Sequence, residues 1–117
     1  MNDIVRIESN KRLSRVVSYN GIVWVGGLTA DDSSQDIQGQ TRQVLAKIDG
    51  YLAKAGTSKN RVLSVEIWLK DIERDFEGMN KAWDAWVPAD AAPARATGES
   101  KLARPESLIE IIVTAAA

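Results

Sequence analysis

The chain has 117 residues and a formal net charge of −1, and it contains neither histidine nor cysteine. Its hydrophobic content of 44% and charged content of 26% are typical of a globular protein, and one domain spanning residues 1–117 is expected. The missing residue types exclude Ser-His-Asp and Cys-His nucleophilic catalysis and zinc sites built on His or Cys. The balanced charge predicts no nucleic-acid partner, and no apolar run is long enough to span a membrane. Without cysteines, and with no signal peptide at Met1, we expect a cytoplasmic protein.

The N-terminal part of the chain predicts strands. Residues 4–7 alternate between apolar and polar types and predict a first strand. Residues 15–27 predict a β-hairpin around Asn20-Gly21, the dipeptide that accepts the two positive φ angles of a type I′ turn. A polar loop follows, in which residues 31–34 offer N-cap candidates for a helix.

Two helices and three further strands follow. Apolar residues recur at helical spacing over residues 37–52, and Gly56 supplies a C-terminal stop. A second helix is predicted over residues 76–86, ended by Pro88. The strands are predicted over residues 62–69, 94–101 and 108–114.

This order of elements predicts an α+β fold with one mixed sheet and two helices on one of its faces. Three of the strands, over residues 22–25, 65–69 and 111–113, contain apolar residues on both faces. Two helices can cover only one face, so a second copy of the chain is expected to cover the other.

Two charged residues stand in otherwise apolar strand-like segments near the C-terminus. They are Arg95 in Pro93-Ala94-Arg95-Ala96-Thr97 and Glu110 in Leu108-Ile109-Glu110-Ile111. Burial of either charge costs several kcal/mol unless it is paired or used. We expect the two in neighbouring strands, as a structural ion pair or as a small site for an anionic substrate. For a purely structural Arg95, the partner would be Glu99 or Glu110.

Five motifs follow one another along the chain: Gly26-Gly27, Ile67-Trp68-Leu69-Lys70-Asp71, Phe76-Glu77-Gly78-Met79-Asn80, Pro93-Ala94-Arg95 and Ile109-Glu110-Ile111. Together, and with the spacing between Arg95 and Glu110, they resemble the YjgF family, also called reactive-intermediate deaminase A and formerly L-PSP endoribonuclease. The resemblance covers nearly the whole chain. The segments over residues 83–88 and 101–105 are similar to a divergent branch of that family.

The resemblance implies a chorismate-mutase-like fold assembled as a homotrimer, with the three sheets lining a central barrel and clefts between subunits. The activity it implies is hydrolysis of reactive 2-imino acids or enamines to 2-keto acids and ammonia. The implied partner is a small carboxylate-bearing substrate, and no cofactor or metal is implied.

By resemblance, Arg95 binds the substrate carboxylate as a bidentate pair, and Glu110 orients or deprotonates the attacking water or passes a proton to the leaving amine. Glu110 could equally be an inward-facing carboxylate that a subunit interface satisfies. Gly26 and Gly27 would let a backbone N–H reach the substrate, although a glycine pair after a strand also suits a plain turn.

Asn80 and Thr97 complete the implied substrate-binding set. Asn80 resembles an amide near the family's cleft, although a helix-surface or capping asparagine is the commoner role. Thr97 stands where well-studied deaminases carry a cysteine, and its backbone would serve the same purpose. A family aromatic residue that closes over the substrate is replaced near Leu13, so the pocket is expected to be wider or to take a different substrate.

The leading hypothesis is therefore a cofactor-free imine or enamine deaminase. The alternative is a non-catalytic trimer of the same fold that binds a carboxylate metabolite or regulates a partner. A ribonuclease ranks third, because the basic residues form no clear stripe and no histidine is available for acid–base cleavage.

Overall fold

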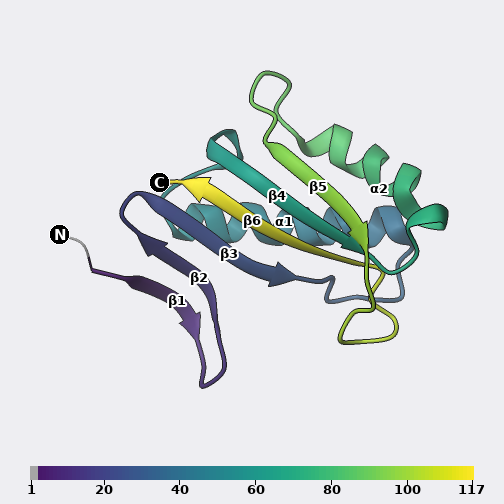
Figure 1. The fold of residues 1–117 in the computed structure, drawn as a ribbon, viewed down its shortest axis with the longest axis horizontal. Helices are drawn as coiled ribbons and strands as arrows, with labels where there is room; N and C mark the ends of the chain where they lie inside the picture. The colour runs from purple at the N-terminus through teal and green to yellow at the C-terminus, as the bar shows by residue number, and fades with distance from the viewer. Residues whose placement is uncertain (1–2) are drawn as a thin grey trace.

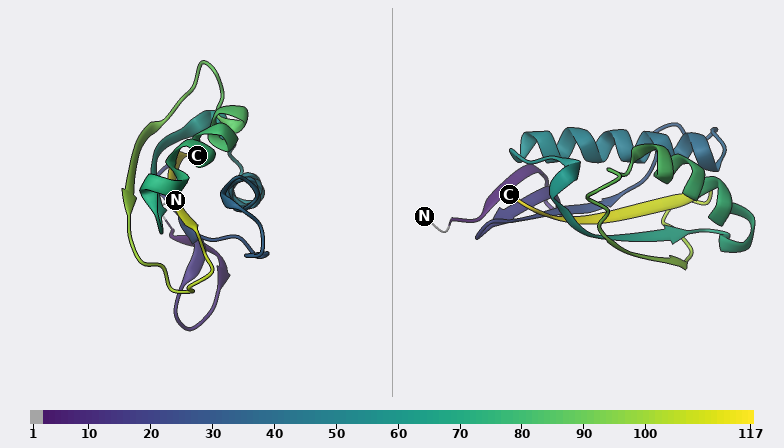
Figure 2. Two further views of the ribbon diagram at one scale, coloured as in Figure 1. Left: turned by 90° about the vertical axis from the view of Figure 1, so that its right-hand side faces the viewer. Right: turned by 90° about the horizontal axis from the view of Figure 1, so that it is seen from above.

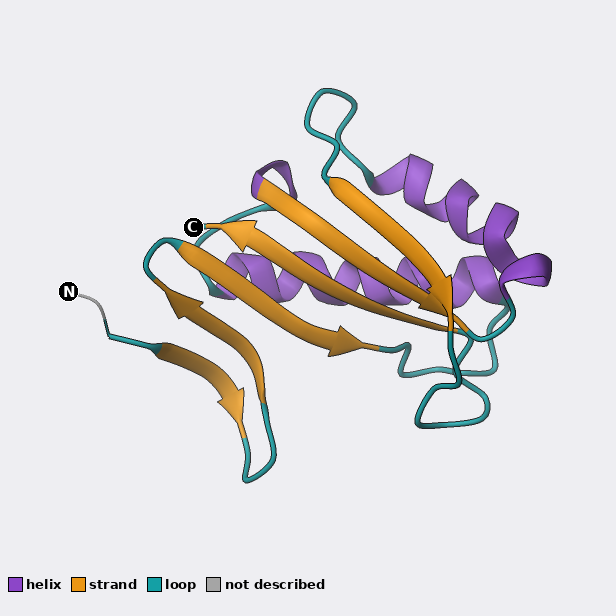
Figure 3. Cartoon of the chain, viewed as in Figure 1, coloured by secondary structure: helices purple, strands orange, loops and turns teal. Residues whose placement is uncertain are grey.

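The computed structural model describes residues 3–117 and contains a six-stranded sheet with two α-helices (Figures 1 and 3). The strand order is β1-β2-β3-β6-β4-β5. Only β4 and β5 pair in parallel, so the sheet is mixed and the predicted α+β class is confirmed. The elements are β1 (Val5–Ser9), β2 (Ser14–Tyr19), β3 (Ile22–Leu28), α1 (Ile37–Lys54), a 3-10 turn (Lys59–Arg61), β4 (Val62–Leu69), α2 (Ile72–Trp86), β5 (Ala94–Glu99) and β6 (Ile109–Ala116).

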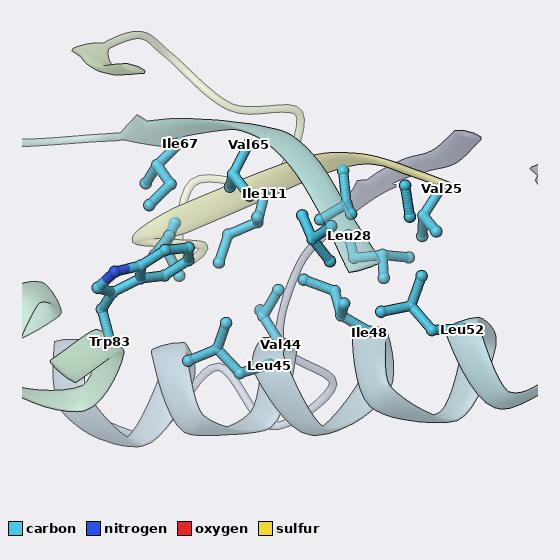
Figure 4. Close-up of a cluster of buried hydrophobic side chains, with 14 of the residues drawn as sticks. Val25, Leu28, Val44, Leu45, Ile48, Leu52, Val65, Ile67, Trp83 and Ile111 are labelled. Atoms are coloured by element: carbon cyan, nitrogen blue, oxygen red, sulfur yellow. The ribbon is translucent and has the colours of Figure 1, made fainter. Parts of the chain in front are cut away.

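Both helices lie on the same side of the sheet, as Figure 2 shows. The hydrophobic core fills the space between the helices and the sheet, where the apolar stripe of α1 packs against the helix-facing residues of the central strands (Figure 4). Val44, Ile48 and Leu52 on α1 are fully buried there, opposite Val25 and Ile111. Neither helix in residues 3–117 is long and apolar enough to cross a membrane.

No helix of residues 3–117 covers the opposite face of the sheet (Figure 2). Along β6, buried residues alternate with half-buried ones, as expected for a strand covered on one side only. Trp24 on β3 is 43% exposed on this face, and Ile112 lies half-buried on it. Polar Ser64 and Glu66 share the face, so the prediction of strands apolar on both faces holds only in part.

The hairpin prediction is confirmed, because Asn20 and Gly21 have φ angles of 49° and 80° and join β2 to β3. The N-cap prediction was wrong: Asp36, rather than a residue of 31–34, caps α1 by accepting a hydrogen bond from the Gly39 N–H. The second helix also begins earlier than predicted. Asp71 caps it, and Ile72 is its first residue.

Candidate active site

Arg95 lies on β5, at one edge of the sheet, and is half-buried. Its guanidinium carbon lies 5.2 Å from the centre of the Trp83 ring, and Nη1 donates to Met79 Sδ at 3.9 Å. No ion pair within residues 3–117 involves Arg95, so neither Glu99 nor Glu110 is its partner. The aromatic face stabilises the cation while leaving its N–H groups open to an external anion.

Glu110 lies on β6 and is half-buried on the uncovered side of the sheet. Its carboxylate rests against Gly27 of β3, where a Cβ atom would lie 2.9 Å from Glu110 Cδ. A larger residue at position 27 would therefore require the Glu110 carboxylate to move. Gly26 differs, because a Cβ added to it would meet backbone oxygens no closer than 3.5 Å. Both glycines fall where the pairing of β3 with β6 shifts register, between Val25 and Leu28.

One chain does not bring Arg95 and Glu110 together. The expectation that their strands are neighbours was wrong, because β4 lies between β5 and β6. Along β4, Arg95 is level with Val65 and Glu110 with Trp68, a shift of three residues. The two Cα positions are thus about 10 Å apart along the strands and about 10 Å apart across them. Arg95 also points toward α2, whereas Glu110 points away from the helices.

Thr97 follows Arg95 by two residues and so lies on the same face of β5. Its Oγ1 is buried without a hydrogen-bond partner in residues 3–117. Asn80 is half-buried in the middle of α2, directly after Met79, which rules out a capping role. Arg95 and Thr97 therefore share the face of β5 that lies toward α2, while Gly27 and Glu110 form a second group on β3 and β6. No hydrogen bond within residues 3–117 joins the Asn80 side chain to either group.

No aromatic residue stands near Leu13 in the sequence, where the resemblance expects the residue that closes over the substrate. Leu13 lies in the loop between β1 and β2 and is 45% exposed. Tyr19 lies at the tip of the β2–β3 hairpin, beside Asn20. The glycine after Thr97 has a local purpose: a Cβ atom at Gly98 would lie 3.0 Å from the Trp68 ring.

Gln40 is a site-supporting residue that the sequence did not single out. It is completely buried on α1, and its side-chain oxygen accepts from the Leu108 N–H at 2.9 Å. Its Nε2 lies 3.1 to 3.2 Å from the backbone oxygens of Ser33, Gln35 and Glu106. Gln40 thereby fixes the loop that leads into Glu110. Its only signal in the sequence is a polar residue on the apolar stripe of a helix.

A cavity of about 370 Å³ adjoins Gly27 and Glu110. Arg15, Lys47, Arg104 and Ser107 also line it. A separate groove of about 460 Å³ runs over the uncovered face beside the backbone of Arg95. Within residues 3–117, no group of carboxylates is arranged to hold a metal ion.

Comparison with known proteins places the chain in a family. The family described as endoribonuclease L-PSP matches residues 3–117. A RutC family protein from Haemophilus ducreyi is 45% identical over 113 residues, or 97% of this chain and 96% of that protein. The solved structure of an uncharacterized protein from Pseudomonas aeruginosa has a TM-score of 0.94 and 43% identity, covering 97% of this chain and 98% of that one. A YjgF family member from Neisseria meningitidis has a TM-score of 0.94 and 41% identity, with 97% and 94% covered. The chain therefore belongs to the endoribonuclease L-PSP family, which includes the RutC and YjgF proteins.

Proposed function

We propose that the protein hydrolyses 2-imino acids, or the enamines that tautomerise to them, to 2-keto acids and ammonia without a cofactor. Water oxygen bonds to C2 of the imine, and the electron pair of the C=N bond moves to nitrogen. After proton transfer to that nitrogen, the C–N bond breaks and its electron pair leaves with ammonia. The former water oxygen, having lost its protons, becomes the carbonyl of the 2-keto acid.

The observation that carries the proposal is an unpaired guanidinium on an aromatic face. Arg95 is held by Trp83 and Met79, and no carboxylate within residues 3–117 neutralises it. Guanidinium recognises a carboxylate through two parallel hydrogen bonds, which fixes the orientation as well as the position of a 2-imino acid. A small substrate bound in this way presents C2 within a few Å of the Arg95 side chain.

Glu110 is the group that we assign to water and proton transfer. Because the chain has no His or Cys, a carboxylate is the side chain best suited to accept a proton near neutral pH. Gly27 leaves room for that carboxylate at the edge of a cavity. We assign the backbone N–H groups of Gly27 and Thr97, and the amide of Asn80, to positioning the substrate.

The proposal requires two chains at each site. Within one chain Arg95 and Glu110 are too far apart, and point in too different directions, for one small imino acid to touch both. We therefore propose a homotrimer whose sheets line a central barrel, in which Arg95, on the edge strand β5 of one copy, lies beside Glu110 of the next copy. The exposed Trp24 side chain on the uncovered face of the sheet supports such an assembly.

The test is turnover of 2-iminobutyrate released in situ from threonine by a dehydratase. Semicarbazide traps the imine and the keto acid at different rates, so added protein should lower imine capture and speed keto-acid formation. Unchanged capture at all protein concentrations would reject the deaminase. If 2-oxobutyrate nevertheless binds, the non-catalytic carboxylate-binding protein would replace the deaminase as the proposed function.

An RNA-cleavage assay belongs in the same experiment, because the family description names an endoribonuclease. The net charge of −1 and the absence of histidine argue against cleavage. Release of oligonucleotides from a single-stranded RNA, lost in Arg95→Ala, would favour the ribonuclease instead.

A further inference from the structure

The cavity beside Glu110 is lined by three basic side chains, although the proposed role of Glu110 in water and proton transfer uses none of them. Arg15 reaches it from β2, Lys47 from α1 and Arg104 from the loop before β6. Two carboxylates, Asp31 and Glu110, line the same space. The cavity thus has one surplus positive charge when both are ionised.

The surplus belongs to the two arginines. Lys47 is paired with Asp31 at 3.0 Å and also donates to the Thr29 carbonyl at 2.8 Å. No ion pair within residues 3–117 includes Arg15. The nearby carboxylate of Glu8, which also feels the charge of Arg15, is bonded to Lys54 instead.

Arg104 has N–H groups to spare. One Nη2 hydrogen bond, at 3.2 Å, goes to the Ala30 carbonyl, and Glu106 approaches its Nε only to 4.0 Å. Ser107, on the same loop, is 1% exposed, and its Oγ has no hydrogen-bond partner in residues 3–117. A buried hydroxyl without a partner is costly, so its placement in the lining of this cavity points to a bound acceptor.

The loop that carries Arg104 and Ser107 is fixed before any ligand arrives. Gln40 holds Glu106 and Leu108, the Ser107 N–H donates to the Arg104 carbonyl at 3.2 Å, and Lys70 donates to the Pro105 carbonyl. A rigid loop loses little conformational entropy when a ligand binds. The two arginines and the serine hydroxyl are therefore a prepared anion site rather than solvated surface charges.

We propose that this cavity binds the side-chain carboxylate of the substrate, so that the preferred substrates are 2-imino dicarboxylates. The inference rests on the proposed function, since the cavity receives a substrate side chain only if Glu110 faces the reacting carbon. Arg95 would then bind the carboxylate next to the imine, and Arg15 and Arg104 the distal one. The corresponding 2-imino monocarboxylates would leave the arginines unpaired.

The test compares binding of two 2-keto acids of equal chain length, 2-oxoglutarate and 2-oxopentanoate, by isothermal titration calorimetry. We expect 2-oxoglutarate to bind at least about tenfold more tightly, because it adds charge-assisted hydrogen bonds. The Arg15→Gln/Arg104→Gln double variant should lose this preference and retain the wild-type affinity for 2-oxopentanoate. Arg12→Gln, which changes an exposed arginine outside the cavity, should keep it.

Equal affinity of the wild-type protein for the two keto acids would overturn the inference, and that result does not depend on how any variant folds. An unchanged preference in a folded double variant would also overturn it. Binding and turnover separate this inference from the proposed function. Selective binding without imine hydrolysis would reject the activity alone, whereas hydrolysis of 2-iminobutyrate with equal affinities would reject only the dicarboxylate preference.

Discussion

At the residue scale, Arg95 and Glu110 each contact a residue from another element of the fold. The sequence identifies both residues, because a charged residue within an apolar strand pattern is costly to bury unless it is paired or used. Their partners are not visible. The Trp83 ring under Arg95 comes from another element, and so does the glycine against Glu110. Which of two adjacent glycines makes that contact depends on a register shift that no local pattern encodes.

We expect Arg95→Ala to abolish imine hydrolysis while leaving the fold intact, because Arg95 makes no ion pair within residues 3–117. Loss of a desolvated charge-assisted pair costs about 2–5 kcal/mol, or roughly 30- to 5,000-fold in kcat/KM. Arg95→Lys should recover little, since an ammonium lacks the planar fork. Kinetics with Arg12→Ala as the control would check this, and wild-type turnover in Arg95→Ala would remove Arg95 from the site.

The glycine pair offers a matched comparison. Gly27→Ala would place a methyl group against Glu110 Cδ at 2.9 Å, whereas Gly26→Ala meets only ordinary contacts of 3.5 Å or more. We expect Gly27→Ala to displace the carboxylate and lower kcat by about 10²-fold, the typical cost of a 1 Å misplacement. Gly26→Ala should remain close to wild type. Equal kcat values in the two variants would show that imine hydrolysis does not depend on the position of the Glu110 carboxylate.

At the element scale, local chemistry predicted most of the fold. The Asn20-Gly21 turn, the stripe of α1 and the stop at Gly56 all depend on neighbours in sequence, and all are present. The spacing of the aromatic residues predicts a start for α2 at residue 76, whereas the helix begins at Ile72, directly after its Asp71 cap. Phe76, the first apolar position of the predicted helix, is 39% exposed. Long-range contacts such as those of Gln40 leave little trace in the sequence.

An ion pair between elements gives a pH-dependent prediction. Glu8 on β1 is bonded to Lys54 and Tyr51 of α1, and the Lys54 hydrogen bond holds the pKa of Glu8 below its ordinary range. A lowered folded-state pKa stabilises the fold above the unfolded pKa, and the contribution is lost as pH falls through the folded pKa. Lys54, whose pKa is raised, stays charged throughout that acid range.

We therefore expect Glu8→Gln to lower the melting temperature near neutral pH, with the difference from wild type closing as the pH falls through the lowered pKa of Glu8. Glu77→Gln, at an exposed glutamate of α2 that forms no ion pair within residues 3–117, is the control and should cause no such pH-dependent difference. Thermal unfolding followed by circular dichroism across this range measures both. A Glu8→Gln difference that is constant with pH would contradict the assignment.

At the scale of the whole molecule, strand order separates the two charged residues. β6 enters the sheet between β3 and β4, so β4 lies between Arg95 and Glu110. The sequence could not settle this, because pairing between strands distant in sequence is set by the packing of the whole sheet rather than by local patterns. The uncovered face, with Trp24 exposed on it, is the surface on which we propose that copies of the chain assemble.

The central claim is that each site combines Arg95 of one chain with Glu110 of another. Complementation tests it most directly: Arg95→Ala and Glu110→Gln are purified as separate inactive proteins, mixed in equal amounts and allowed to exchange subunits. Random mixing should restore imine hydrolysis to about a quarter of the wild-type rate, since about one interface in four then contains both native residues. If differently tagged subunits co-purify, proving exchange, yet the mixture stays as inactive as its components, the shared site is wrong.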